Sequence, residues 1–247
     1  MVAPDNQLDH AVATPRDVLE GADGGRVLDV ATGQGGFVQF LVDGLPSFTE
    51  IIGVDISDRG RDAFGETFGD RRRVRFEVMD GRAMSFADAS FDTVAISDSL
   101  HHFEDPDAVL LEMLRVLRPG GRLIVVEMYR DRQAPTQQTH VDFHHWTAEI
   151  NQADGVFHRQ TYARAELVGM LAALRLQAVR LYDQVEMSDD PRDPATIAAH
   201  EPIIARFLGR AAGNPDLIRR GEAIRERLHS VGIHGATELV YVGAKSA

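Results

Sequence analysis

Four aspartates that each close a short apolar run are the side chains best placed to do chemistry: Asp29, Asp55, Asp80 and Asp98. If the runs are parallel strands, these carboxylates meet at the carboxyl edge of one sheet, where open α/β sheets bind ligands. A carboxylate at Asp55 could accept hydrogen bonds from both hydroxyls of a ribose. Asp80 could accept one from an exocyclic adenine amine. The alternative is that each aspartate only caps the helix that follows it.

A glycine-rich turn follows the first of these runs. Residues 27–37 read VLDVATGQGGF, an apolar run that ends in a turn and opens a helix. Gly33 and Gly35 let a ligand approach the backbone closely, and the amides that follow can face a carboxylate or a phosphate. A dinucleotide-binding loop of the G-x-G-x-x-G type would need glycine at position 38, where the chain has Val38. The turn is therefore a candidate ligand site, and Val38 counts against NAD as its ligand.

Two neighbouring histidines follow the fourth run, within the sequence SLHHFEDP. Histidine is the natural general base near neutral pH, so His101 or His102 could take a proton from a substrate. The alternative is a histidine that packs in the loop or bonds to the backbone. We choose His102 as the catalytic candidate of this pair.

A second group of histidines lies in HVDFHHWTAEI, residues 140–150. Two pairs there are four residues apart, as on one face of a helix: His140 with His144, and His145 with Glu149. That spacing also suits metal ligands, but no third ligand has a convincing spacing, although His158 could approach. We therefore predict no metal site. The segment is either a solvated helix face anchored by Trp146 or a lid whose His144 and His145 contact the substrate, and these two are our further catalytic candidates.

The elements that must position these residues alternate between apolar runs and amphipathic stretches. Runs rich in Val and Ile predict strands at 26–31, 50–55, 74–79, 91–97 and 122–128, and 105–117 is the clearest helix. Beyond residue 129 we expect a helix and loop over 140–157, a helix over 162–174, and strands over 177–185 and 238–244. A helical insertion, 189–233, separates those last two strands. The pattern predicts an α/β fold with a parallel sheet covered by helices on both faces.

These motifs, in this order, resemble the S-adenosylmethionine-dependent methyltransferases with a Rossmann-like fold, most closely the ubiquinone and menaquinone biosynthesis-type branch. The sequences that carry the resemblance are VLDVATGQGGF, GVDIS, VMDGRAMSF, FDTVAISDSLHHFEDP and LRVLRPGGRLIVVEM. The resemblance implies a seven-stranded, mostly parallel sheet whose last strand is antiparallel, with the helical insertion before it. It also implies a single domain over 1–247, with a cofactor-binding core at about 26–130. Substrate-covering elements are expected at about 140–158 and 189–233.

The resemblance implies S-adenosylmethionine as cofactor and assigns residues to its parts. The loop after the first strand would surround the methionine part through Asp29, Ala31, Thr32, Gly33, Gln34 and Gly35. Asp55 and Ile56 would hold the ribose, and Asp80 and Gly81 the adenine. Ser97 would lie near the sulfonium. The implied reaction is methyl transfer to a small-molecule acceptor by in-line displacement, which needs a general base only where the acceptor must lose a proton.

The amino-acid composition excludes several kinds of binding and several kinds of site. The chain has 247 residues, with 38 acidic against 26 basic side chains and a net charge of −12, which opposes non-specific binding to nucleic acid or to an anionic membrane. Cysteine is absent, which excludes disulfides, thiolate metal sites and cysteine nucleophiles. We expect a cytoplasmic protein, because Met1–His10 is polar and unlike a signal peptide. The insertion helices could pair in a homodimer. A non-catalytic S-adenosylmethionine-binding protein and a NAD-dependent oxidoreductase stay open as alternatives.

Overall fold

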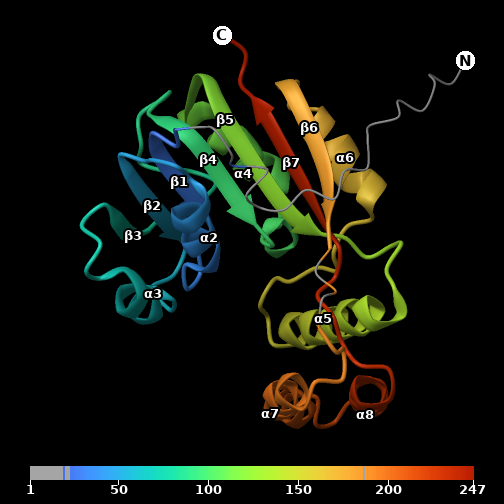
Figure 1. Ribbon diagram of the computed structural model, residues 1–247. Helices are drawn as coiled ribbons and strands as arrows, with labels where there is room; N and C mark the ends of the chain where they lie inside the picture. Colours follow the sequence, from blue (N-terminus) through green and yellow to red (C-terminus); the bar gives the residue numbers. More distant parts are fainter. Residues whose placement is uncertain (1–18, 20–22, 186, 188) are drawn as a thin grey trace, which may run out of the picture.

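The fold is built on one seven-stranded sheet with the strand order β3-β2-β1-β4-β5-β7-β6 (Figure 1). The computed structural model describes Leu19 and residues 23–185, 187 and 189–247, so the expectation for Met1–His10 lies outside the described part. The strands are β1 (Arg26–Val30), β2 (Glu50–Asp55), β3 (Val74–Val78), β4 (Phe91–Ser97), β5 (Leu117–Met128), β6 (Gln177–Gln184) and β7 (Glu238–Ala244). Strand β7 is antiparallel to both β5 and β6, and the pairs among β1 to β5 are parallel. The predicted fold class, with its antiparallel last strand, is confirmed.

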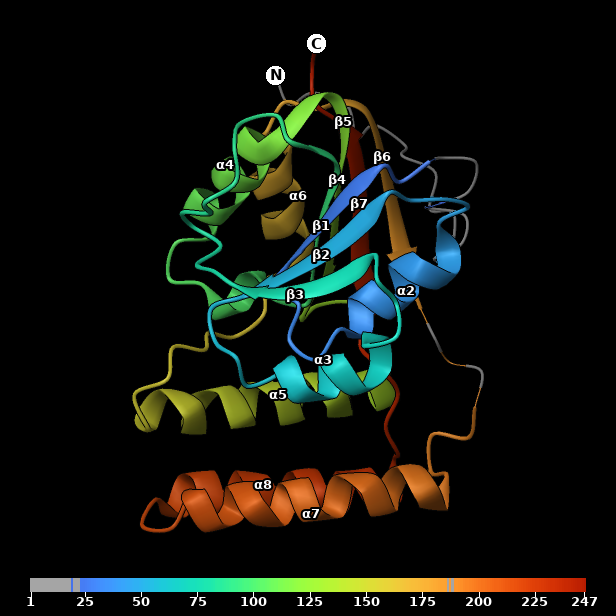
Figure 2. The same cartoon turned by 90° about the vertical axis from the view of Figure 1, so that its left-hand side faces the viewer.

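Helices cover both faces of the sheet, and a further helical layer lies beyond its carboxyl edge (Figures 1 and 2). One face carries α2 (Gly36–Gly44) and α3 (Arg61–Phe68), and the other carries α4 (Pro106–Val116) and α6 (Arg164–Ala172). A short 3-10 turn, η1 (Leu100–His102), follows β4. The outer layer consists of α5 (Pro135–Ala153), α7 (Pro194–Arg210) and α8 (Pro215–Ser230). None of the helices in the described residues is long and apolar enough to cross a membrane.

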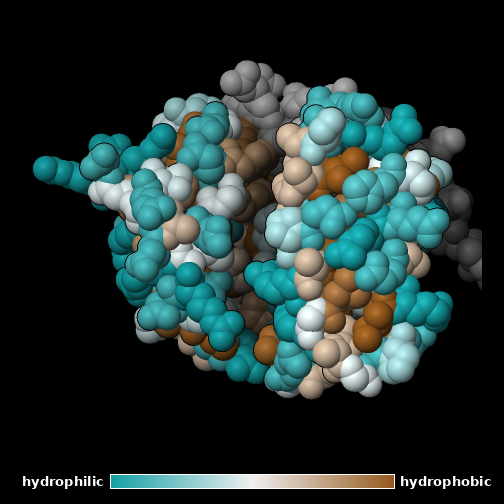
Figure 3. All heavy atoms as spheres, turned by 90° about the horizontal axis from the view of Figure 1, so that it is seen from below, coloured by the Kyte–Doolittle hydropathy of each residue, from teal (hydrophilic) through white to brown (hydrophobic). Residues whose placement is uncertain are grey.

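The outer helical layer has an apolar core of its own. Trp146 of α5 is fully buried against Phe207 of α7 and Leu217 of α8, and its indole Nε1 donates a 2.8 Å hydrogen bond to the carbonyl of Leu217. Seen from the side of these helices, a cleft with apolar walls separates the layer from the part of the molecule that carries β3 and α3 (Figure 3). The carboxyl ends of the parallel strands point toward this layer (Figure 1).

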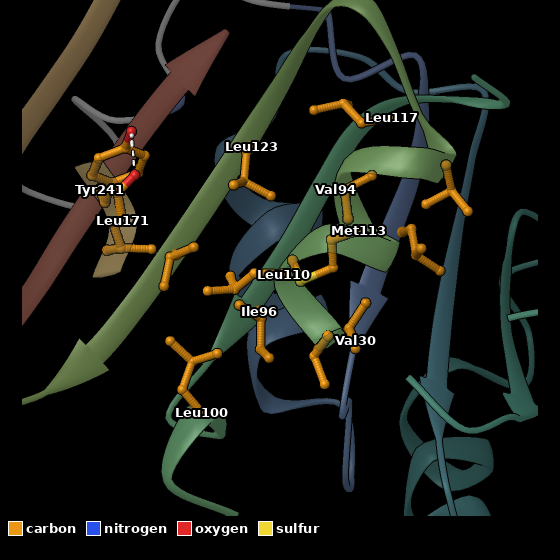
Figure 4. Close-up of a cluster of buried hydrophobic side chains, with 14 of the residues drawn as sticks. Val30, Val94, Ile96, Leu100, Leu110, Met113, Leu117, Leu123, Leu171 and Tyr241 are labelled. Atoms are coloured by element: carbon orange, nitrogen blue, oxygen red, sulfur yellow. Dashed lines mark hydrogen bonds between the residues drawn. The ribbon is translucent and has the colours of Figure 1, made fainter. Parts of the chain in front are cut away.

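The sheet separates two further apolar cores, because neighbouring residues of a strand point to opposite faces. On β1, Leu28 belongs to the core under α4 and α6, whereas Val27 belongs to the core under α2 and α3. Figure 4 shows the first of these cores, with Leu110 and Met113 of α4 packed against the strands. Strands that are buried on both faces read as continuous apolar runs, which is why β1, β2, β4 and β5 were recognisable in the sequence.

Two elements begin more than two residues away from the predicted position. Helix α5 begins at Pro135 rather than at His140, because proline suits a first helical turn and the Gln137 side chain accepts a 3.0 Å hydrogen bond from the Ala134 amide. Residues 118–121, which lie between the predicted helix over 105–117 and the predicted strand over 122–128, are part of β5. They form an irregular extension of that strand: Leu117 pairs with Phe91, the register then shifts, and Gly120 has a φ of 75°.

Candidate functional site

The loop after β1 turns sharply at the carboxyl edge of the sheet. Ala31 has a φ of 57°, Gly33 of 53° and Gly35 of 90°, so three of five successive residues occupy the left-handed region. For Ala31 this conformation is strained, and such strain concentrates at ligand sites. Gly35 is required for a second reason, because a Cβ atom there would lie 2.7 Å from a ring carbon of Phe68. The loop leads directly into α2.

Asp55, at the end of β2, connects that loop to the neighbouring strand. Its Oδ2 accepts a 3.0 Å hydrogen bond from the Gly33 amide, and its Oδ1 accepts one of 3.1 Å from the Ser57 amide. The next residue, Ile56, is 66% exposed, which is unusual for isoleucine. The ribose-binding pair expected from the sequence is thus held beside the glycine-rich loop.

Asp29 and Thr32 are buried polar side chains without hydrogen-bond partners in the part of the chain that the structure describes. Neither carboxylate oxygen of Asp29 nor the hydroxyl of Thr32 has a hydrogen-bond partner among the described residues, although the two side chains lie near one another. Burial raises the pKa of Asp29 to about 7; the neighbouring Thr32 hydroxyl lowers this pKa, and the negative charge of Asp55 raises it. A buried carboxylate without partners is costly, so this position suits a ligand that brings donors or positive charge.

A cavity of about 260 Å³ collects five of the eleven predicted cofactor residues. Its lining contains Ala31, Asp55, Ile56, Asp80, Gly81 and His102 from the sequence prediction, and also Arg82, Phe103, Glu104 and Phe157, which the prediction missed. Gly33, Gly35 and the exposed Gln34 lie in the adjoining loop. The Asp80 carboxylate pairs with Arg82, whose Nη2 lies 2.7 Å from Oδ2, and this arginine lowers the pKa of Asp80. An adenine amine at Asp80 would therefore share the carboxylate with Arg82.

Ser97 lies in a second cavity, of about 300 Å³, on the α2 side of the same edge. This cavity is bounded by Ser97 and Asp98 at the end of β4, by Phe37 and Phe40 of α2, and by the ends of β5, β6 and β7. The two phenylalanine rings are stacked with centroids 5.1 Å apart. Asp98 has a φ of 43°, and burial together with the charge of Glu127 raises its pKa to about 6. The second cavity is thus an aromatic and apolar space beside carboxylates.

Three histidines from separate elements converge below the end of β4. The Nε2 atom of His144, on α5, lies 3.1 Å from Nε2 of His101 on η1 and 3.0 Å from Nε2 of His158 in the loop after α5. His101 is fully buried, and its Nδ1 lies 2.7 Å from Oε1 of the fully buried Glu127 on β5. Burial lowers the pKa of His101 to about 4 and that of His158 to about 3, so both are neutral near pH 7. We call these three residues the three-histidine cluster.

The other residues of the predicted histidine pairs have different contacts. His145 Nε2 accepts a 3.2 Å hydrogen bond from the Thr161 amide and lies 2.9 Å from the Thr161 hydroxyl oxygen. His140 Nδ1 accepts one of 2.9 Å from the Ala236 amide, and Glu149 pairs with Arg220 on α8. His102 lines the first cavity, with its ring centroid 4.2 Å from that of His158. The i, i+4 pairs therefore do not form a site together, and only His144 joins the three-histidine cluster.

The two expected covering segments are placed differently. Phe157, from segment 140–158, lines the first cavity. No described residue of segment 189–233 lines either cavity, because α7 and α8 pack against α5 in the outer core. Coverage of a substrate by segment 189–233 stays a prediction.

Comparison with known proteins identifies a family in the part of the chain that carries β1 to β5. Residues 28–125 match the family model described as "Methyltransferase domain". A ubiquinone/menaquinone biosynthesis C-methyltransferase from Geobacter sulfurreducens is 38% identical over 116 residues, covering 45% of this chain and 44% of the relative. A demethylmenaquinone methyltransferase from Deinococcus radiodurans is 41% identical over 103 residues, covering 41% and 42%. The match thus spans less than half the length of each of these curated relatives.

The whole fold also has a counterpart among solved structures. The crystal structure of the YcgJ protein from Bacillus subtilis superposes with a TM-score of 0.60, covering 94% of this chain and 96% of that chain at 18% identity. This likeness extends beyond residue 125 and therefore includes β6, β7 and the helices around them. At this level of identity it concerns the fold alone.

Proposed function

Since the chain carries a methyltransferase domain of the S-adenosylmethionine-dependent, ubiquinone/menaquinone type, we propose that it transfers a methyl group from that cofactor to a small-molecule acceptor by in-line displacement. The observation that carries the proposal is the arrangement at the carboxyl edge. There Asp29 and Thr32, which have no hydrogen-bond partner in the described part of the chain, lie next to the strained loop that Asp55 holds beside the first cavity.

The residues present fit the cofactor. An amino-acid ammonium group would bring positive charge and donors to the acceptor-rich pair Asp29 and Thr32, which lack partners among the described residues. We assign the methionine part to the loop 31–35, the ribose to Asp55 and Ile56, and the adenine to Asp80 and Gly81. When bound, the cofactor supplies an activated methyl group on a sulfonium. The protein's contribution is to orient the reactants and exclude water, and proximity alone can contribute roughly 7 to 11 kcal/mol.

We place the acceptor in the second cavity, beside Ser97. The stacked rings of Phe37 and Phe40 favour an apolar or aromatic small molecule, while Asp98 offers an oxygen that could orient a hydroxyl or amine. The names of the curated relatives refer to quinone biosynthesis, but the match covers less than half of each, so their acceptors are not carried over. None of the predicted bases His102, His144 and His145 lines the second cavity, so removal of a proton from the acceptor by one of them stays a prediction from the sequence.

Calorimetry with S-adenosylmethionine, S-adenosylhomocysteine and NAD tests the cofactor half of the proposal. We expect micromolar affinity for both sulfur nucleotides and no heat with NAD. Binding of NAD alone would overturn the proposal in favour of an oxidoreductase. Against that alternative, Val38 is fully buried at the position where a dinucleotide loop needs glycine, and β7 enters the sheet antiparallel.

Transfer from methyl-labelled cofactor tests the catalytic half. Incubation with a fractionated cell extract should place label in the small-molecule fraction and leave precipitated RNA and protein unlabelled. Cofactor binding without label in any fraction would favour the non-catalytic alternative. Label in RNA would contradict the small-molecule acceptor. A cytoplasmic location and a homodimer stay predictions from the sequence.

A further inference from the structure

We propose that the three-histidine cluster, His101, His144 and His158, binds a divalent transition-metal ion through its three Nε2 atoms, with zinc as the first candidate. The ligand atoms all lie within 4.8 Å of one another, and they come from three separate segments: η1, α5 and the loop after α5. The expectation of no metal site rested on the lack of a third ligand near α5 in the sequence. The fold brings that third ligand from the end of β4.

Hydrogen bonding alone does not satisfy the contacts of this cluster. An imidazole nitrogen has one in-plane position, which holds either a proton or a lone pair. His144 Nε2 can therefore form one good hydrogen bond, yet it lies 3.1 and 3.0 Å from two other ring nitrogens. In every neutral tautomer one of these two contacts lacks a proper hydrogen bond. A cation that accepts the lone pairs of all three nitrogens removes the conflict.

The spacing of the nitrogen atoms is close to that of a metal centre. Zinc binds histidine nitrogen at about 2.0 to 2.1 Å, which places neighbouring ligands of a tetrahedral centre about 3.3 Å apart. The two contacts of His144 are a few tenths of an ångström shorter, and the ligand atoms of His101 and His158 lie within 4.8 Å of one another. Rotation of the rings toward equal spacing would admit the ion.

The residues behind the ligands match the surroundings of metal-bound histidines. A ligating imidazole commonly donates its other N–H to a carboxylate, and His101 Nδ1 lies 2.7 Å from Oε1 of Glu127. The same carboxylate accepts a 2.8 Å hydrogen bond from the Leu100 amide through Oε2, which orients it. His158 Nδ1 lies 3.0 Å from the side-chain amide nitrogen of Asn151, whose oxygen accepts a 2.8 Å hydrogen bond from Arg210 Nη2. Metal binding through His158 Nε2 would protonate Nδ1, so this amide would have to turn over and exchange its bond to Arg210.

The donor set also indicates the class of ion. Three imidazoles without a thiolate suit zinc, cobalt, nickel, copper or ferrous iron, whereas magnesium and calcium prefer oxygen ligands. Three protein ligands leave a fourth position for water or for an oxygen of another molecule, as in catalytic zinc sites. His102 and Phe157 line the first cavity and directly adjoin ligands His101 and His158 in the chain. The ion would therefore hold the loop after α5 against the cavity.

A titration of the chelator-treated 247-residue chain with Co²⁺ and Zn²⁺ tests the site. Co²⁺ should bind at one equivalent with the visible absorption of a tetrahedral centre, and Zn²⁺ should displace it. The variant His144→Gln should weaken binding at least a hundredfold. The control is His229→Gln, whose side chain is exposed on α8 and contacts Glu201; this variant should bind like the wild type. Absence of stoichiometric binding by the wild type, or equal binding by both variants, would overturn the proposal.

A second variant covers the case in which His144→Gln does not fold. Glu127→Gln keeps the shape of the side chain and removes its charge behind His101, and loss of such a partner typically weakens metal binding 10- to 100-fold. Unchanged affinity in a folded Glu127→Gln variant would contradict the arrangement. Circular dichroism of each variant reports whether it is folded.

The metal proposal stands apart from the proposed function, except that a fourth ligand supplied by the methyl acceptor would rest on that function. Calorimetry with S-adenosylmethionine on metal-free and metal-loaded protein separates the two. Metal binding without cofactor binding would support the metal site and contradict the proposed methyl transfer. Cofactor binding without metal binding would support the proposed methyl transfer and contradict the metal site.

Discussion

The backbone amide of Gly33 donates a 3.0 Å hydrogen bond to Oδ2 of Asp55, so the loop after β1 and the end of β2 form one unit. Asp55 has a second oxygen that accepts from Ser57 and lies beside the first cavity. This single carboxylate thus shapes the glycine-rich loop and is the proposed acceptor for a ribose. Its removal should act on ligand binding both directly and through the loop.

The substitution Asp55→Ala should weaken S-adenosylmethionine binding by on the order of 1.5 to 3 kcal/mol, the range for hydrogen bonds that involve a charged group. That is roughly a ten- to hundredfold rise in the dissociation constant measured by calorimetry. The control is Asp58→Ala, an exposed aspartate in the loop that follows, which should bind like the wild type. Equal affinity of Asp55→Ala and wild type would remove Asp55 from the site.

The pKa of Asp29 predicts a pH-dependent stability difference. Because the pKa is raised from 3.8 to about 7 on folding, the native state holds this proton longer than the unfolded chain. Ionisation of Asp29 therefore lowers the free energy of unfolding. This loss is absent at pH values below the unfolded pKa, grows between about pH 4 and pH 7, and reaches its full size above that range. Near pH 8 the free energy of unfolding of Asp29→Asn should therefore exceed that of the wild type by on the order of a few kcal/mol, and the variant should unfold at a higher urea concentration.

Near pH 5 much of this advantage of Asp29→Asn should disappear, because native wild-type Asp29 is then protonated and neutral, and only ionisation of the unfolded chain above its pKa of 3.8 still counts against folding. Urea unfolding at the two pH values checks the prediction, and the difference between variant and wild type cancels groups that titrate in both. A constant offset at both pH values would mean that Asp29 ionises normally. Calorimetry on the same variant should show weaker cofactor binding, since the negative charge is lost.

Gly221 on α8 should tolerate no side chain. A Cβ atom there would lie 2.4 Å from Cζ2 of the buried Trp146, so Gly221→Ala should lower the free energy of unfolding by about 1 to 3 kcal/mol through overpacking. Gly169 in α6 is the matched control, because a Cβ atom there would have nothing within 4 Å, and Gly169→Ala should stabilise by about 0.5 to 1 kcal/mol. Thermal or urea unfolding decides whether the two alanines have opposite effects.

Alanine variants of His145 and His102 should show which of the two histidines supports the fold and which supports methyl transfer. His145→Ala leaves the buried Thr161 amide without its acceptor, so it should cost about 1 to 3 kcal/mol of stability. His102→Ala, in the wall of the first cavity, should leave the unfolding free energy nearly unchanged and lower methyl transfer. A His145→Ala variant as stable as wild type but inactive would instead support its predicted catalytic role.

Much of the cofactor half was predictable, because its signals are local. The strands β1, β2 and β4 are buried on both faces and read as apolar runs, and the glycine-rich turn and Asp55 stand where those runs end. Parallel strands share a carboxyl edge, so knowing where each run ends places these residues together. The structure accordingly brings Ala31, Asp55 and Asp80 into one cavity. Ser97 follows the same logic but faces the neighbouring cavity on the α2 side.

The sequence by itself thus determined the sheet, the polar residues at its carboxyl edge and the kind of domain, since these depend on short-range periodicity. Only the tertiary structure decided how α5 lies beneath that edge, because the core around Trp146 joins it to α7 and α8, far along the chain. That packing brings together His144 and His101, which are 43 positions apart, whereas the helical spacing pointed to His140. A contact between distant segments depends on how their elements pack, and residue spacing within one helix carries no information about it.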